Sequence, residues 1–123
     1  MPCLRIETNV SKESFNQEKM ANELLEAIAK SMGKPIEYCM VVIVPDTLIF
    51  TGVDKTGKLP SVNASLMSIG CLGLKENKKL VAVLYPIIQK YLGVNEGLCY
   101  IQFKDVPSKD LSYKNMTFHD ILG

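Results

Sequence analysis

The stretch LLEAIAKSMG, residues 24–33, recurs later in the chain as LYPIIQKYLG, residues 84–93. In both stretches the apolar residues follow the spacing of an amphipathic helix, and both end at a glycine. Glycine favours the left-handed conformation in which many helices end, and Pro35 reinforces the first stop. A shift of 60 positions (93 − 33) superposes the two stretches and also aligns Cys39 with Cys99. The chain is therefore predicted to contain two copies of one structural unit.

A strand-like segment flanks each predicted helix on either side. The four segments cover Cys3–Val10, Tyr38–Val44, Val62–Ile69 and Cys99–Phe103. The order strand, helix, strand therefore occurs twice. Two such crossover units predict a two-layer α/β (α+β) fold, with a four-stranded mixed sheet, parallel strands inside each unit and both helices on one face. The units span about residues 1–50 and 60–110 of one predicted domain, 1–123.

Local features of these segments are also predictable. Ser14 and Gln17 fit a capping box at the start of the first helix, and Asn77 is a candidate cap for the second. Pro86 lies well inside the second helical pattern, where its ring predicts a kink or a delayed start. The turn-rich stretch 45–60 has room for a short hairpin. The sheet face away from the helices is expected to carry enough Val, Ile and Leu to need a cover, which oligomerisation would supply.

Length and composition exclude several classes of protein. A chain of 123 residues with 47% hydrophobic residues can bury one core but not two ordinary ones. The charged residues nearly balance, at a formal +1, and are scattered along the chain apart from a short cluster at Lys75–Lys79. This distribution argues against a nucleic-acid partner. No apolar run reaches the roughly 20 residues that span a bilayer, and Arg5 and Glu7 stand where a signal peptide would be apolar. We therefore expect a soluble cytoplasmic protein without a membrane partner.

The cysteines and the single histidine do not predict a metal or redox centre. The cysteines are far apart, without a Cys-x-x-Cys pair, at Cys3, Cys39, Cys71 and Cys99, and His119 lies near the tail. We interpret Cys39 and Cys99 as small buried hydrophobes in a reducing compartment.

The dipeptide Met1-Pro2 is a candidate for chemistry. Removal of the methionine would leave Pro2 with a free secondary amine, which is a rigid main-chain base or carbonyl nucleophile. A strand that merely starts with proline gives the same dipeptide, so the pair needs support from other residues.

Further motifs occur in one order along essentially the whole chain. They are Met1–Leu4 with Thr8–Val10, Gly33–Pro35 with Tyr38, Ser68–Gly70, Tyr100-Ile101, and Asn115-x-Thr117-Phe118. In this combination the chain resembles the macrophage migration inhibitory factor (MIF) family of the tautomerase superfamily. The resemblance implies the same doubled βαβ unit, assembled as a homotrimer whose sheets surround a central channel.

The resemblance also implies that Pro2 is the catalytic base and that Lys34 binds the substrate carboxylate, without a cofactor or metal. An α-amino group titrates near about 7.7–8.0, and proline is somewhat more basic. Burial and the Lys34 charge would both lower that pKa toward the working pH. Pro2 could then take a proton from the carbon next to a carbonyl and return it elsewhere. Without the resemblance, Lys34 is better explained as a surface lysine at the negative end of the first helix.

The other site residues are implied in the same way. The Ile69 backbone would help to hold the substrate acid, and Tyr100 from a neighbouring subunit would form a wall beside the proline. Aromatic surface around the mouth would come from Tyr38, Tyr113 and Phe118. Each residue also has an ordinary structural explanation, as core, as a strand aromatic or as simple packing.

The chain departs from the family pattern at several positions. Gln102 stands where asparagine is common, which keeps an amide in the substrate site with a longer reach, and Tyr113 stands where tryptophan is common. Residues 50–52 replace a Phe-Gly-Gly-Ser turn, and the tail continues over residues 119–123, where it could cover or crowd the site. Ser61–Ala64 stands in place of the family's Cys-x-x-Cys, so thiol oxidoreductase activity is not expected.

Two functions are compatible with this sequence. One is a keto–enol tautomerase of phenylpyruvate or related aromatic α-keto acids, and the alternative is a cytokine-like protein that binds a receptor and has a vestigial pocket. Both can hold together, and the resemblance leaves secretion without a signal peptide open. An isomerase of unsaturated dicarboxylic acids ranks lower, because it needs a second cation near Pro2 and only Lys34 matches a motif.

Overall fold

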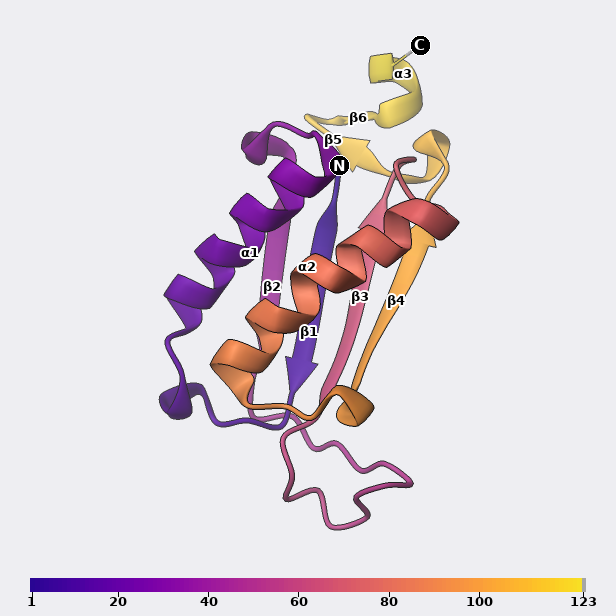
Figure 1. Cartoon of the computed structure of the whole chain (residues 1–123). Coiled ribbons are helices and arrows are strands. Elements are labelled where there is room, and N and C mark those ends of the chain that lie inside the picture. Colours follow the sequence, from indigo (N-terminus) through magenta and orange to yellow (C-terminus); the bar gives the residue numbers. More distant parts are fainter. Residues whose placement is uncertain (123) are drawn as a thin grey trace.

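Alternating apolar residues build a four-stranded sheet in the computed structural model, which describes residues 1–122 (Figure 1). The strands are β1 (Cys3–Thr8), β2 (Met40–Val44), β3 (Val62–Ser68) and β4 (Cys99–Asp105). They lie in the order β2-β1-β3-β4, with β1 parallel to β2, β3 parallel to β4, and β1 antiparallel to β3. This topology confirms the predicted mixed sheet with parallel strands inside each unit.

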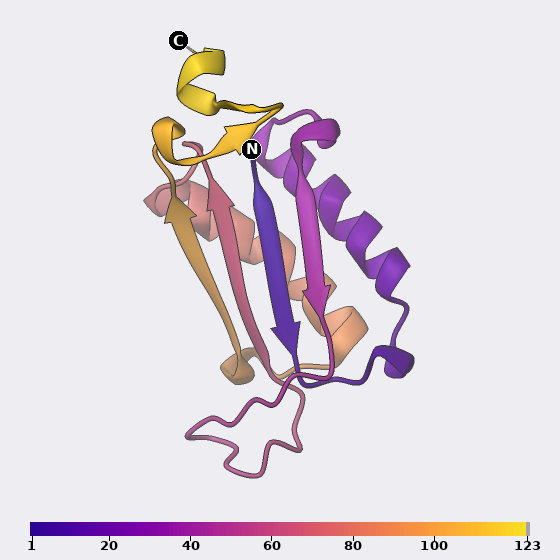
Figure 2. The same cartoon turned by 180° about the vertical axis from the view of Figure 1, so that it is seen from behind.

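Both long helices, α1 (Gln17–Met32) and α2 (Leu74–Leu92), cover the same face of the sheet (Figures 1 and 2). Their inward faces and the strands form one core whose residues are at most 4% exposed, among them Leu4, Ile6, Met20, Leu24, Ile28, Leu66, Leu84 and Ile88. Gly33 and Gly93 end the helices in the left-handed conformation, each with φ of 62°. The repeated sequence pattern therefore corresponds to two copies of one βαβ unit.

The predicted helix starts were wrong in detail. Asn16 caps α1 by accepting from the Lys19 N–H at 3.0 Å, while Ser14 belongs to the preceding short helix η1 (Lys12–Ser14). Helix α2 begins after Gly73, so it starts well before Pro86 and continues through that residue. Asn77 lies inside the first turn, where its Oδ1 accepts from the Gly73 N–H at 3.2 Å.

The segment between the two units forms a loop and not the hairpin for which it had room. Within residues 45–61 no strand is formed, and the loop extends from the sheet end opposite the amino terminus (Figure 1). Its order comes from Asp54, whose carboxylate accepts from the Thr56 Oγ1 at 2.6 Å and from the Leu59 N–H at 2.8 Å. These bonds lower the pKa of Asp54. The other short helices are η2 (Ile36–Tyr38), η3 (Glu96–Leu98) and η4 (Ser108–Asp110).

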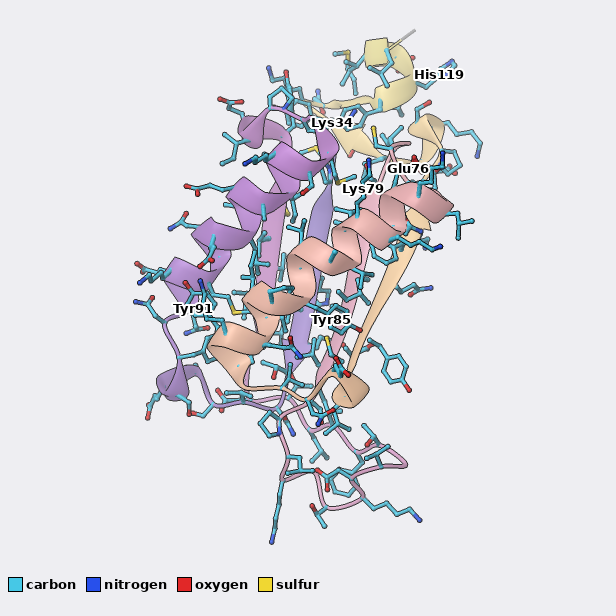
Figure 3. The ribbon with its side chains drawn as sticks, in the orientation of Figure 1. Lys34, Glu76, Lys79, Tyr85, Tyr91 and His119 are labelled. Carbon is cyan, nitrogen blue, oxygen red and sulfur yellow. The ribbon has the colours of Figure 1, made fainter. Side chains whose placement is uncertain are left out.

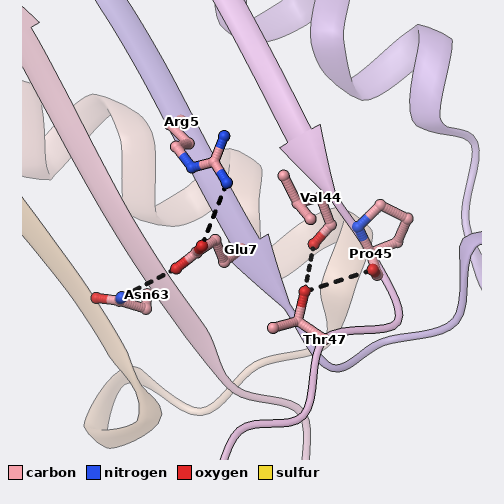
Figure 4. Close-up of polar contacts among 6 residues, drawn as sticks. All are labelled: Arg5, Glu7, Val44, Pro45, Thr47 and Asn63. Carbon is pink, nitrogen blue, oxygen red and sulfur yellow. Dashed lines mark hydrogen bonds and ion pairs between the residues drawn. The ribbon is translucent and has the colours of Figure 1, made fainter.

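The free face of the sheet is more polar than the sequence predicted. Glu7 accepts from Arg5 at 3.4 Å and from the Asn63 Nδ2 at 3.1 Å on this face (Figure 4). The strand register brings only Val42 and Val44 of the expected aliphatic residues to it, because the isoleucines and leucines of the four strands alternate toward the helices. The prediction of a Val-, Ile- and Leu-rich free face was therefore wrong.

Candidate functional site

A cavity of about 370 Å³ opens at the end of the sheet where the amino terminus, the segment after α1 and the C-terminal residues meet. Five of the residues predicted for the site line it, namely Lys34, Tyr38, Ile69, Tyr113 and Phe118. The lining is completed by Met1, Pro35, Lys114, Met116, Ile121 and Leu122. The sequence motifs from four separate segments thus converge on one cavity.

Helix α1 positions Lys34 by the way it ends. Gly33 turns the chain in the left-handed conformation, and the Lys34 N–H donates to the Ala29 carbonyl at 3.0 Å. The Lys34 side chain lies at the cavity end of α1 (Figure 3) and is only partly exposed. On the other side, Ile69 follows β3, and the next N–H, that of Gly70, donates to Asp105 at 2.9 Å. The position of Lys34 is therefore fixed by its own N–H, and that of Ile69 by the bond from the next N–H to the Asp105 carboxylate.

The C-terminal residues build one wall of the cavity from elements that the sequence did not predict. A hairpin of β5 (Ser112–Tyr113) and β6 (Met116–Thr117) leads into α3 (Phe118–Leu122). Both turn residues of the hairpin, Lys114 and Asn115, have positive φ, at 51° and 65°. The tail, which was expected to cover or crowd the site, borders the cavity through Ile121 and Leu122. Gly123, the last residue of that tail, lies outside the described residues.

Three aromatic rings hold this wall in place. The ring centre of Tyr113 lies 5.6 Å from that of Tyr38 in an edge-on contact and 5.7 Å from that of Phe118 in a stacked one. Phe118 is buried, and its N–H donates to the Leu111 carbonyl at 2.8 Å. His119, which follows, is exposed on the outside of α3 (Figure 3).

The amino terminus adds an amine to the cavity, and the surroundings shift the pKa of this amine. Burial lowers the pKa of the Met1 amine below its ordinary value of 8.0, and the nearby Lys34 charge lowers it further. The next residue, Pro2, is fully buried, and its carbonyl accepts from the Met40 N–H at 3.0 Å.

The family described as "Macrophage migration inhibitory factor (MIF)" matches residues 1–119 of this chain. The chain belongs to the MIF family. The macrophage migration inhibitory factor of Xenopus laevis is 34% identical over 96% of this chain and 99% of its own length, and that of Mus musculus is 30% identical over the same shares. The structure of the macrophage migration inhibitory factor from Trichinella spiralis has a TM-score of 0.86 at 22% identity, with 94% of this chain and 99% of that chain covered, so the fold is shared as well.

Three residues predicted from the MIF resemblance do not line the cavity within one chain. They are Pro2, which is fully buried, and Tyr100 and Gln102. Tyr100 and Gln102 lie on β4 and are exposed on the free face of the sheet, with Tyr100 71% exposed. Tyr100 lines a groove with the loop residues 47–52 at the other end of the sheet. Within one chain of this MIF family member they are therefore separated from Pro2, and the contribution of Tyr100 from a neighbouring subunit stays a prediction.

Sequence reasoning on the MIF motifs missed one cation. Lys114 lines the same cavity as Lys34, and its Nζ lies 5.5 Å from the centre of the Tyr113 ring. The available signal was its position between Tyr113 and the motif Asn115-x-Thr117-Phe118. Of the cysteines interpreted as core, Cys99 is buried, whereas Cys39 is only partly buried.

The described part of this MIF family member contains neither a cluster of metal-ligating side chains nor a helix that could span a membrane. Among residues 1–122, no three His, Cys, Asp or Glu side chains gather closely enough to hold a metal ion. Within the same residues, no helix is sufficiently long and apolar to cross a membrane.

Proposed function

We propose that this chain is a cofactor-independent keto–enol tautomerase of phenylpyruvate or a related aromatic α-keto acid, in which Pro2 is the general base after removal of Met1. The observation that carries the proposal is the cavity that combines the amino terminus, the Lys34 cation and a wall of aromatic rings. The reaction requires a base, a partner for the substrate carboxylate and an apolar surface for the aromatic ring, and each part of the cavity meets one of these requirements.

Removal of Met1 changes the chemistry of Pro2 completely. While Met1 is attached, the Pro2 nitrogen belongs to a tertiary amide, which has no useful basicity. Once Met1 is removed, the nitrogen becomes a secondary amine one residue deeper than the Met1 amine. Burial and the Lys34 charge already lower the pKa of the Met1 amine, and the same two causes would act on Pro2. A larger share of the Pro2 amine would then be unprotonated at neutral pH.

The proposed reaction moves one proton and shifts two electron pairs. The Pro2 nitrogen takes a proton from the carbon next to the keto group, and the electrons of that bond form the carbon–carbon double bond. The π electrons of the keto group move to its oxygen, which then receives the proton held by Pro2, so that the enol forms and the Pro2 amine is free again. The reverse sequence returns the keto form, so no atom or electron is lost and no cofactor is required.

The substrate would be held by the residues around the amine. Lys34 would bind its carboxylate together with the Ile69 backbone, and Tyr38, Tyr113 and Phe118 would contact its aromatic ring. Tyr100 and Gln102 would come from a neighbouring subunit of a homotrimer, in which β4 of one chain borders the cavity of the next. Their exposure on the free sheet face supports that arrangement.

The decisive variant is Pro2→Gly in protein from which Met1 has been removed, as verified by intact mass. Glycine keeps a free amine but not the rigid secondary one. We expect the rate of phenylpyruvate enol–keto conversion to fall by about 100-fold or more, which is the usual contribution of a general base. A matched sample that retains Met1 should be inactive. Native rates in Pro2→Gly would refute the assignment, and light scattering should give about three times the 13.7 kDa chain mass for both proteins.

A cytokine-like function is the second candidate, because the relatives carry the name macrophage migration inhibitory factor. In that case the surface of the trimer would bind a receptor protein, and blocking Pro2 would leave the binding intact. If the trimer and the receptor protein do not bind each other at micromolar concentrations, this candidate is contradicted. That result would not bear on the proposed tautomerase activity.

A further inference from the structure

The cavity contains a second cation that the proposed reaction does not use. Lys114 lines it together with Lys34, and none of the described lining residues is acidic. Neither lysine forms an ion pair with any of residues 1–122. Two unneutralised positive charges on one apolar cavity favour a ligand that brings negative charge of its own.

The position of Lys114 is set by the hairpin. It occupies the β5–β6 turn with φ of 51°, and its Nζ is held 5.5 Å from the Tyr113 ring centre. That ring contacts Tyr38 and Phe118, so the cation is tied to the aromatic wall and not to the amine. If the aromatic ring of a substrate packs against this wall, the Lys114 charge is near the end of that ring that is far from the reacting carbon.

Lys34 and Lys114 therefore relate differently to the amino terminus. Lys34 lowers the pKa of the Met1 amine, whereas the Lys114 ammonium lies over the Tyr113 ring. The carboxylate beside the reacting keto group belongs near the amine, which assigns it to Lys34. An anion that meets Lys114 must then lie elsewhere on the same ligand.

We propose that Lys114 binds a second anionic group, so that the preferred substrate is an α-keto acid whose apolar body ends in another carboxylate. The proposal rests on the proposed tautomerase function and names the substrate class of that site. The proton transfer at Pro2 is the same as for a monocarboxylate. Lys114 contributes through binding, because its charge faces a group that does not change during the reaction.

The test compares phenylpyruvate with 4-carboxyphenylpyruvate, which differs by one carboxylate at the far end of the ring. The native protein without Met1 is expected to have a kcat/KM about tenfold higher for the second acid, mainly through KM. Lys114→Met keeps the length of the side chain and removes its charge. It should abolish this preference, so that the ratio of the kcat/KM values for the two acids falls to about one. Lys78→Met, an exposed position on α2 outside the cavity, should retain the preference.

The outcomes separate this inference from the function on which it rests. Equal kcat/KM for the two acids, or a preference that survives Lys114→Met, would overturn the role of Lys114 while the tautomerase stands. If neither acid is turned over, the proposed function fails, and calorimetric titration with both acids decides on Lys114. Tighter binding of 4-carboxyphenylpyruvate that is lost in Lys114→Met would support the second anion site, and equal affinities would overturn it.

Discussion

Two buried hydroxyl groups on adjacent strands are expected to respond in opposite directions to their removal. Ser68, at the end of β3, is fully buried, and its Oγ has no hydrogen-bond partner among the described residues. Thr8, at the end of β1, is equally buried, but its Oγ1 donates to the Ser61 carbonyl at 2.8 Å and accepts from the Val10 N–H at 3.2 Å. One hydroxyl therefore carries an uncompensated cost, while the other completes a local network.

The magnitudes follow from these partners. A buried polar group without a partner costs about 1–3 kcal/mol. Ser68→Ala removes that cost and opens only a small void, so the free energy of unfolding should rise by about 1 kcal/mol. Thr8→Val keeps the shape of the side chain but leaves the Ser61 carbonyl and the Val10 N–H unpaired. Its free energy of unfolding should fall by about 1–3 kcal/mol.

Urea unfolding of the two variants and the native chain measures both effects. All samples need the same protein concentration, because the stability of an oligomer depends on it. Unchanged m-values with midpoints shifted in opposite directions are the expected result. If Ser68→Ala is less stable than the native chain, the Ser68 hydroxyl has a stabilising role in the folded protein and the reasoning is refuted.

Two further predictions concern the cavity. Lys34→Met should raise the pKa of the amine there, because burial remains while the neighbouring positive charge is lost. Since a base must be unprotonated to act, the rise of kcat/KM with pH should move to higher pH in Lys34→Met. The control variant Lys78→Met should keep the native pH profile. An unchanged pH profile in Lys34→Met would contradict the role of Lys34. Phe118→Ala removes the ring stacked on Tyr113 and should increase hydrogen exchange in residues 112–122 while the amides of α1 and α2 keep their protection. Native exchange in that segment would show that the stack does not hold the tail.

The repeated helix and strand patterns predicted the main fold because each reports a local property. Leu24 and Ile28 recur at helical spacing as Leu84 and Ile88, and all four are fully buried. The free face of the sheet was predicted less well, since counting the aliphatic residues of a strand does not say which way they point. The register decides that direction, and it turns Ile6 toward the helices together with Ile43 and Ala64, which lie beside it on the adjacent strands.

The C-terminal wall could not be predicted from local sequence. Its strands are only two residues long, too short for a periodic signal, and they are held by contacts between distant residues such as Tyr38 and Tyr113. The resemblance named Tyr113 and Phe118, and both line the cavity, whereas Lys114 lies outside every motif and became visible only in the cavity. Tyr100 poses a different problem, because its predicted partner belongs to another copy of the chain.

The duplicated unit also explains why only one end of the sheet has the proposed chemistry. Because β1 and β3 are antiparallel, the two units present corresponding ends in opposite directions, and a second cavity of about 300 Å³ lies at the other end, lined by residues 53, 59–60, 93, 95 and 97–98. The shift of 60 positions (93 − 33) places Val94 where the first unit has Lys34, and Val94 is buried. It also places Val62 at the position of Pro2, in the middle of the chain, where the backbone nitrogen is an amide. The second end therefore lacks a counterpart of Lys34 and of the Pro2 nitrogen, so the proposed chemistry is expected only at the end that contains Lys34.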